Sequence, residues 1–273
     1  MILYKYYSFS CGKLALESEN LGFRTPNFFN DPFEASVICS DQEIETSFNE
    51  ILKNVVILSL TRTPLNALMW AHYGEEHKGF VIGYDVDDQF FKCKTNNLIP
   101  IQQGNVIYTK TKPIINISEF FLNELDNHIK GLVSEFEDDK YSTKSLVSHL
   151  FLNKDTIWSY EEEVRLVKPI IDWTTEHEQF LNNPFNQHSI PSREKEIMPG
   201  CFKIEEETPG LKIYSYPVKI KEVYLGYRND CIKNQDEKVI KLLRNLRIKG
   251  CQVYSISNDK TSWDLIKREL NDF

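Results

Sequence analysis

The apolar run VVILSL at residues 55–60 is the feature that most limits the folds open to this chain. Its apolar residues do not alternate with polar ones, so we expect a strand that is covered on both faces. Other strand-type patterns occur at 2–9, 21–25, 80–86, 105–110, 158–168, 218–228 and 251–257. Helical spacing of apolar residues occurs at about 11–20, 41–54, 65–74, 117–153, 236–250 and 262–270.

This order of elements predicts an α+β fold, with a twisted, mixed and mostly antiparallel sheet flanked by helices. A β–α–β unit is visible at 218–257, and no long parallel series precedes it. The length of 273 residues allows one large domain or two small ones. We expect a single domain over 1–273, with a helical insertion at about 117–153. The polar segment at about 172–212 contains four prolines and is read as a functional flap or a partly mobile segment.

Composition narrows the class of protein. The formal net charge of −8 disfavours a protein that coats nucleic acid. The six cysteines show no CxxC spacing and no clustering with histidine, so we expect reduced thiols and no metal site. The N-terminal sequence lacks an export signal, and no window of 18 apolar residues is present. We therefore expect a cytoplasmic protein without a membrane span. The dinucleotide and P-loop glycine motifs are also absent from the sequence.

The segment WSYEEEVRLVK at 158–168 combines three carboxylates with strand-forming residues. In an extended chain, alternate side chains share a face, so Glu161, Glu163 and Arg165 would point one way and Glu162 the other. We interpret this face as the floor of a polar site. The alternative is an edge strand with a solvated charged face, because exposed carboxylate–arginine ladders are common.

Two further segments hold unusual concentrations of polar and aromatic residues. The loop PNFFNDPFEA sets Asn30 and Asp31 among three phenylalanines, and it is either a rigid polar tip beside a pocket or a well-packed turn. The segment MWAHYGEEHKG brings together Trp70, His72, Tyr73, His77 and Lys78. These side chains either line a site or belong to the core and the surface.

The chain resembles a known family in three stretches, LYKYYSF…FFNDPFE, LSLT…MWAHYGEEHKGFVIGYD and WSYEEEVRLV. In this order and spacing they resemble the bacterial domain-of-unknown-function family 2971. The resemblance extends over nearly the whole chain and includes IKEVYLGYR near the end. NDPFE and WAHYGEEHKGF are the most specific matches. The family name supplies no chemistry.

A second resemblance, to ADP-ribosyltransferases, does imply chemistry. Their third signature is often Glu-x-Glu on a late strand, and Glu161-x-Glu163 is similar to it. Tyr4-Lys5-Tyr6 occupies the place of the first signature, although neither Arg nor His is present. The second signature would be Ser59 or Tyr73. The resemblance implies an ADP-ribosyltransferase-like core, NAD as substrate, and a nucleic acid or a protein as acceptor. It further suggests a toxin or antiviral defence effector, which would need a neutralising antitoxin protein.

Roles follow from the chemistry of nicotinamide–ribose cleavage, which builds positive charge on the sugar. Glu163 would stabilise that charge and hold the ribose, Glu161 would orient or deprotonate the acceptor, and Tyr73 would complete the catalytic group. Arg165 could bind the pyrophosphate bidentately or only hold Glu163 in place. The remaining candidates for the NAD site are Tyr4, Lys5, Tyr6, Asn30, Asp31, Ser59, Trp70, His72 and Lys78, with Trp70 or Tyr73 stacking on nicotinamide.

Two other classes of function remain open. One is a hydrolase, such as a nuclease or glycosidase, that uses Glu161 and Glu163 with or without a metal. The other is a non-catalytic binding or interaction module in which Glu163 and Arg165 are structural.

Overall fold

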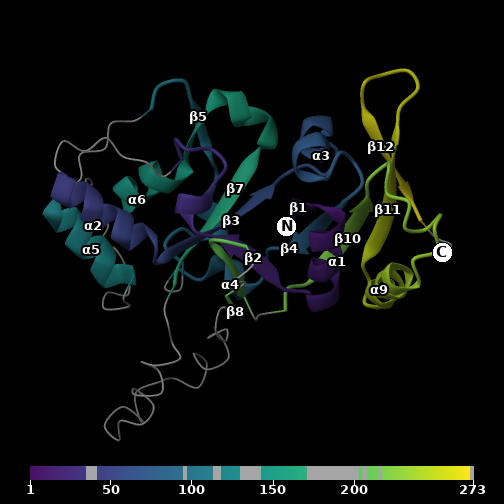
Figure 1. The fold of residues 1–273 in the computed structure, drawn as a ribbon, viewed down its shortest axis with the longest axis horizontal. Helices are drawn as coiled ribbons and strands as arrows, with labels where there is room; N and C mark the ends of the chain where they lie inside the picture. The colour runs from purple at the N-terminus through teal and green to yellow at the C-terminus, as the bar shows by residue number, and fades with distance from the viewer. Residues whose placement is uncertain are drawn as a thin grey trace, which may run out of the picture.

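The computed structural model of the protein describes residues 1–34, 42–94, 97–112, 118–129, 143–170, 203–204, 208–214 and 217–270 (Figure 1). Ten strands in this part of the chain form one sheet: β1 Ile2–Tyr7, β2 Leu21–Arg24, β3 Val55–Thr61, β4 Phe80–Asp85, β7 Glu163–Pro169, β8 Lys203–Ile204, β9 Leu211–Tyr214, β10 Ile220–Leu225, β11 Gln252–Asn258 and β12 Leu265–Glu269. A separate small parallel pair consists of β5 Ile107–Thr109 and β6 Asn153–Asp155.

The helices of the described chain are α1 Phe9–Ser18, α2 Gln42–Leu52, α3 Ala67–Tyr73, α4 Gln89–Lys92, α5 Glu119–Ile129, α6 Thr143–Leu152 and α9 Glu237–Ile248. Three short 3-10 helices accompany them: η1 Pro26–Phe28, η2 Ile101–Gln103 and η3 Thr156–Glu161. Within the described residues, no helix is long and apolar enough to cross a membrane.

The sheet is mixed and mostly antiparallel, as the sequence predicts. Its order is β12-β11-β10-β4-β1-β3-β2-β9-β8. Strand β7 lies outside this order and pairs with β3. Within this sheet, β10 and β11 form the parallel pair, and α9 makes the crossover between them. β3 lies inside the sheet, and six of its seven residues are buried. The expectation of a strand covered on both faces at 55–60 is confirmed.

Helices cover both faces of the sheet (Figure 1). On one face, α1, α4 and α9 pack with β-strand residues in the largest apolar core. The other face carries two separate apolar clusters. The helices α2, α5 and α6 pack on Val55, Ile57 and Val167, whereas α3 packs on Tyr6, Val81 and other residues toward β11. Polar side chains occupy the sheet surface between these two clusters.

Strand register explains which polar side chains meet there. Thr61 lies opposite Tyr4 on one side and opposite Glu163 on the other, and Ser59 lies opposite Arg165. Residues directly opposite one another point to the same face. Tyr4, Ser59, Thr61, Glu163 and Arg165 therefore share the face that carries the two smaller clusters.

The last element differs from expectation, because residues 262–270 do not form a closing helix. Leu265–Glu269 is strand β12, which pairs with β11 in an antiparallel hairpin. Asp259 stabilises the connecting loop, because its carboxylate accepts hydrogen bonds from the backbone of Thr261 and Ser262. Hydrogen bonding and packing against β11 stabilise this segment as a strand more than its helical spacing would stabilise it as a short helix.

The segment 158–168 also differs, because only its second half is extended. Residues 156–161 form η3, capped by the Asp155 carboxylate, which accepts from Ile157 N at 2.8 Å. Glu162 then adopts a left-handed conformation, and β7 begins at Glu163. Every residue of β7 is buried. The alternative of a solvated edge strand is thus wrong, because segment 99–106 hydrogen-bonds along the outer side of β7, for example from Arg165 N to Gly104 O at 2.7 Å.

One sequence expectation falls largely outside the described residues, and a second is described in part. Most of the segment 172–212, interpreted as a flap, is not described, although β8 and β9 lie at its end. The helical pattern at 117–153 is represented by α5 and α6.

The turn after α3 contains three consecutive non-glycine residues with positive φ, namely Glu75 (50°), Glu76 (52°) and His77 (70°). Such conformations cost free energy in L-residues, so other contacts must hold the turn. Phe9 N, at the start of α1, donates to the Glu75 carboxylate at 2.7 Å. The His77 ring stacks on Trp70, with centroids 6.1 Å apart.

We predict that Glu76→Gly raises the free energy of unfolding by up to about 1 kcal/mol, because glycine relieves the left-handed strain. Glu76→Val should lower it by about 1 kcal/mol, since a β-branched residue tolerates positive φ poorly. Urea unfolding measures both. The matched control is the exposed helical position Lys241, where glycine should instead lower the free energy of unfolding by about 1 kcal/mol. Equal effects of glycine at both positions would contradict the strain argument.

Candidate functional site

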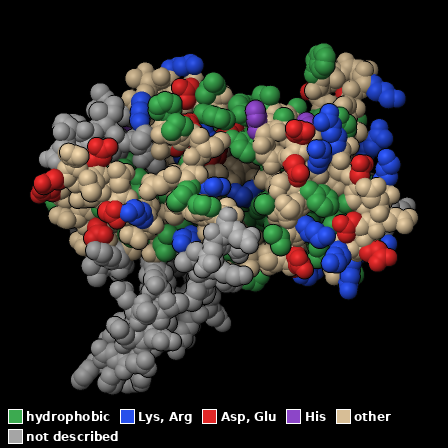
Figure 2. Space-filling model, in the orientation of Figure 1, with side chains coloured by type: hydrophobic (Ala, Val, Ile, Leu, Met, Phe, Trp, Pro, Cys, Tyr) green, Lys and Arg blue, Asp and Glu red, His purple; other side chains and the backbone are tan. Residues whose placement is uncertain are grey.

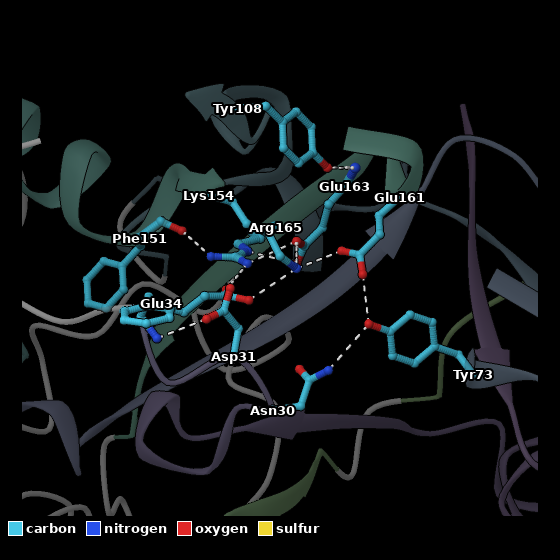
Figure 3. Close-up of polar contacts among 11 residues, drawn as sticks. Asn30, Asp31, Glu34, Tyr73, Tyr108, Phe151, Lys154, Glu161, Glu163 and Arg165 are labelled. Carbon is cyan, nitrogen blue, oxygen red and sulfur yellow. Dashed lines mark hydrogen bonds and ion pairs between the residues drawn. The ribbon is translucent and has the colours of Figure 1, made fainter. Parts of the chain in front are cut away.

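Five buried charged side chains meet on the sheet face between the two smaller apolar clusters (Figure 3). They come from segments far apart in the chain: Glu34 from the NDPFE loop, Lys154 from β6, Glu161 from the end of η3, and Glu163 and Arg165 from β7. We call these five residues the charge cluster. Burial of so many charges requires that each be paired and hydrogen-bonded.

Arg165 is the central cation and is 1% exposed. Its Nε and Nη2 donate to the two carboxylate oxygens of Glu163 at 2.8 and 2.9 Å, which is a bidentate pair. Nη2 also donates to Glu34, and Nη1 donates to the backbone oxygen of Phe151 at 2.6 Å. The Phe29 ring lies 5.6 Å from the guanidinium carbon. This side chain therefore joins β7, α6 and the NDPFE loop.

Lys154 is the second cation, and it contacts all three carboxylates. Its Nζ lies 2.6 Å from Glu161 Oε2, 3.1 Å from Glu163 Oε2 and 3.1 Å from Glu34 Oε1. The three distances match the three donors of an ammonium group. The Trp158 ring lies 5.1 Å from Nζ. Because η3 bends the chain between Glu161 and Glu163, both carboxylates reach the same ammonium.

Electrostatics follow from this pairing. Burial raises the pKa of Glu163, but the charges of Arg165 and Lys154 outweigh it and lower this pKa to about 2. The Ser59 hydroxyl adds a hydrogen bond in the same direction. Burial also raises the pKa of Glu34, and here the nearby cations compensate less. Burial opposes the charge on Lys154, yet the three carboxylates raise its pKa. Three carboxylates and two cations leave a formal charge of −1.

Glu161 connects the charge cluster to the surface. Its Oε1 accepts from the Tyr73 hydroxyl at 2.7 Å, and the amide of Asn30 donates to the same hydroxyl at 3.4 Å (Figure 3). Tyr73 is half-buried and Asn30 is exposed. Burial, and then the hydrogen bond to Glu161, raise the pKa of Tyr73, so the phenol remains protonated. Figure 2 shows a hollow near the middle of the molecule, between the part with α2, α5 and α6 and the part with α3.

The structure thus brings several of the predicted site residues together. Glu161, Glu163, Arg165, Ser59 and Tyr73 belong to the charge cluster or hydrogen-bond to it, and Asn30 extends it. Glu162 is exposed and takes no part in these contacts. Asp31 lies beside the cluster but is engaged in its own loop, where it accepts from Phe33 N at 2.9 Å.

Other predicted site residues lie elsewhere. Lys5 points to the opposite sheet face, and its Nζ donates to Ser59 O at 3.3 Å. Burial lowers the pKa of Lys5 to about 8. Tyr4 hydrogen-bonds to Glu222, and Tyr6 donates to Thr63 O.

Trp70 is fully buried, and its indole NH donates to Pro64 O at 2.8 Å. Its interpretation as a stacking platform for nicotinamide is wrong, because the side chain has no exposed surface and His77 already stacks on the ring. His72 is exposed, with its ring 6.3 Å from that of Tyr160, and Lys78 is exposed near Glu76.

Three residues of the site were missed at the level of sequence. Glu34 is part of the NDPFE motif, but the site residues predicted from this motif were Asn30 and Asp31. Lys154 sits on a three-residue strand, and no local pattern marks it. Tyr108, on β5, accepts a hydrogen bond from Glu163 N at 2.9 Å. Glu34 is also a third carboxylate beside Glu161 and Glu163, although the sequence suggested none.

The cations Lys154 and Arg165 lie between the carboxylates of Glu34, Glu161 and Glu163. The described residues contain no group of three His, Cys, Asp or Glu side chains placed to hold a metal ion. The charge cluster is instead an anionic site whose charges are largely neutralised from within.

Comparison with known proteins gives one family match. Residues 69–166 match the family described as "Protein of unknown function (DUF2971)". The matched stretch runs from α3 to the middle of β7 and includes four of the five residues of the charge cluster, Lys154, Glu161, Glu163 and Arg165, together with Tyr73. It supports the resemblance carried by WAHYGEEHKGF and WSYEEEVRL, whereas NDPFE and IKEVYLGYR lie outside it. No curated protein and no solved structure matches the chain.

We predict that Glu163→Gln lowers the free energy of unfolding by about 3–5 kcal/mol, because it leaves Arg165 and Lys154 buried with too little negative charge. Urea unfolding measures the loss. Glu162→Gln is the matched control, since Glu162 is adjacent and exposed, and it should change the free energy of unfolding by less than about 0.5 kcal/mol. Similar losses in the two variants would contradict the central place of Glu163.

The effect of Glu163→Gln should depend on pH. The pKa of Glu163 falls from its ordinary value of 4.5 to about 2 on folding, so the unfolded chain takes up this proton first. The stabilisation by the ionised carboxylate is present above about pH 4.5 and is lost as the pH falls toward 2. The gap in unfolding free energy between wild type and variant should therefore narrow over this range. A gap that is constant from about pH 6 to about pH 3 would contradict the assignment.

Proposed function

We propose that the protein is an NAD-dependent ADP-ribosyltransferase-like enzyme in which Glu161 faces the substrate. The observation that carries this proposal is the position of the Glu161 carboxylate, fixed between Lys154 and Tyr73 at the end of the charge cluster next to exposed groups. Transfer of ADP-ribose needs a fixed anion at the sugar, because the reacting carbon becomes positively charged.

The chemistry is a substitution at C1 of the nicotinamide ribose. The bond from C1 to the nicotinamide nitrogen breaks, and its electron pair leaves with nicotinamide. An acceptor atom forms the new bond to C1, and its proton passes to Glu161. Each carboxylate oxygen can accept two hydrogen bonds. Oε1 of Glu161 accepts one from Tyr73 and can therefore take a second from a ribose hydroxyl.

The other members of the cluster hold this carboxylate in place. Lys154 binds Glu161 directly, and Lys154 is itself bound by Glu163, which Arg165 holds in place. Both oxygens of Glu163 are bonded to the buried cations Arg165 and Lys154, so we assign Glu163 a positioning role. Glu161 is also buried, but its Oε1 is bonded to the half-buried Tyr73. In this proposal the exposed amide of Asn30 and the half-buried ring of Tyr73 contact the nucleotide.

The acceptor in this proposal is a nucleic acid or a protein. The net charge of −8 favours contact with a few nucleotides over coating of a long polymer. Such activity fits a toxin or antiviral defence effector in the cytoplasm, and a cell that makes it would need a neutralising antitoxin protein.

We expect purified protein to release nicotinamide from NAD in the presence of cell extract as a source of acceptor. Glu161→Gln should reduce this rate by about 100-fold or more, because the anion at the sugar is lost. Tyr73→Phe should reduce it less, by about tenfold, since it removes one hydrogen bond that positions Glu161. Chromatographic measurement of nicotinamide gives both rates.

Glu162→Gln serves as the matched control and should keep the wild-type rate. Circular dichroism and urea unfolding establish that each variant is folded. Wild-type protein that neither binds nor consumes NAD would contradict the proposal.

A second candidate is a non-catalytic binding module, and the mutual pairing inside the charge cluster favours it. Arg165 and Lys154 satisfy the carboxylates without any ligand, as a purely structural network would. In that case the wild-type protein would not release nicotinamide from NAD, and Glu161→Gln would only lower the melting temperature. Rate and melting temperature measured on the same variants distinguish the two candidates.

A further inference from the structure

A second polar group on the same sheet face lies away from the charge cluster, toward the β12 edge. It consists of Tyr4 from β1, Glu222 and Tyr224 from β10, Tyr254 from β11 and Lys267 from β12. These five residues are called the tyrosine cage below. The strand register brings them together, because β1, β4, β10, β11 and β12 are successive strands of the sheet.

Three aromatic rings form the walls of the tyrosine cage. The rings of Tyr224 and Tyr254 are stacked, with centroids 4.9 Å apart and an interplanar angle of 25°. The ring of Tyr4 meets Tyr224 edge-on at 5.9 Å. Tyr224 is fully buried and Tyr254 is 8% exposed, so neither ring turns freely. Aromatic faces held in this way carry negative potential that attracts cations.

A carboxylate supplies the matching charge. Glu222 is 9% exposed, and its Oε2 accepts from Tyr4 at 2.9 Å and from Tyr224 at 2.7 Å. Both phenols use their protons in these bonds. Burial raises the pKa of Tyr4 to about 12, which keeps its phenol protonated. Glu222 is thus an anion whose partners among these rings are neutral, unlike Glu163 in the charge cluster.

The cation in the tyrosine cage is the protein's own ammonium group. Lys267 Nζ lies 4.2 Å from the ring centroid of Tyr254 and 5.6 Å from that of Tyr224. It also donates to the Tyr224 hydroxyl at 3.3 Å. A chain of hydrogen bonds therefore runs from the ammonium through Tyr224 to the carboxylate of Glu222. Lys267 shows what chemistry the tyrosine cage accepts.

Lys267 is a replaceable occupant. It is an exposed residue on β12, which is the last strand at this edge of the sheet. Its long side chain can move into solvent without breaking the β11–β12 ladder, whereas Tyr224, Tyr254 and Glu222 are held in place by burial.

We propose that the tyrosine cage is a binding site for an alkylammonium group, and that Lys267 occupies it until such a ligand displaces it. The ligand class is a methylated or primary amine, free or on a polymer, whose positive charge takes the place of Lys267 Nζ against the ring of Tyr254, next to the Tyr224 hydroxyl that donates to Glu222. This proposal does not depend on the ADP-ribosyltransferase proposal, because it uses none of the residues of the charge cluster.

The test uses tetramethylammonium as the probe and nuclear magnetic resonance titration of the full-length protein. Lys267→Gln removes the resident cation, so we expect it to bind the probe at least about tenfold more tightly than wild type. Lys267→Gln/Glu222→Gln should lose about tenfold of that affinity, since the carboxylate becomes a neutral amide of the same shape. Chemical shift changes should centre on Tyr4, Tyr224 and Tyr254.

Arg268→Gln is the matched control. Arg268 is the exposed neighbour of Lys267 on β12, faces the other side of the strand and also carries one positive charge. It should bind the probe as wild type does. Equal affinities for Lys267→Gln and Arg268→Gln, or no saturable binding by Lys267→Gln, would overturn the proposal. Thermal unfolding shows that all variants are folded, and NAD turnover is measured separately, so that failure of one proposal does not imply failure of the other.

Discussion

The buried pairing of Arg165 with Glu163 is the interaction on which the rest of the polar face depends. A guanidinium that is 1% exposed can remain charged only if carboxylates and carbonyl groups replace its water. Glu163, Glu34 and the Phe151 carbonyl do so, from three different segments. Because Arg165 can be buried only when all these partners are in place, β7, α6 and the NDPFE loop must assemble together. Lys154 extends the same requirement to β6 and η3.

The two apolar clusters on this face explain why the charges gather where they do. The helices α2, α5 and α6 need one set of apolar strand residues and α3 needs another, and the sheet between them is left to polar groups. A gap of this kind would fill with water if the side chains did not neutralise one another. Paired charges close most of the gap, and the remaining contacts of Glu161, Tyr73 and Asn30 lead outward.

Much of the fold follows from sequence periodicity, and the exceptions have physical causes. Strand β3 was predicted because an apolar run without alternation has few other solutions. Strand β12 was not predicted, because it is stabilised by its pairing with β11. The spacing of apolar residues within 262–270 carries no information about that pairing. Glu161 and Glu163 converge as expected but for a different reason, since a 3-10 turn brings them together on Lys154. Glu34 could not be predicted, because contacts across 120 or more residues, such as that with Lys154, leave no local pattern. Lys154 is close in sequence to Glu161 and Glu163, but its contacts with them depend on the 3-10 turn that follows β6.

Two of the buried glutamates on this sheet face, Glu163 and Glu222, offset the free-energy cost of burial in opposite ways. Glu163 is neutralised by two cations that are themselves buried, so its charge cannot be exchanged without disrupting the fold. Glu222 accepts hydrogen bonds from neutral phenols, and the nearby cation reaches it from the exposed edge strand through Tyr224. A carboxylate held by neutral donors keeps its electrostatic attraction available to an incoming cation. The first arrangement fixes structure, and the second is suited to a ligand that comes and goes.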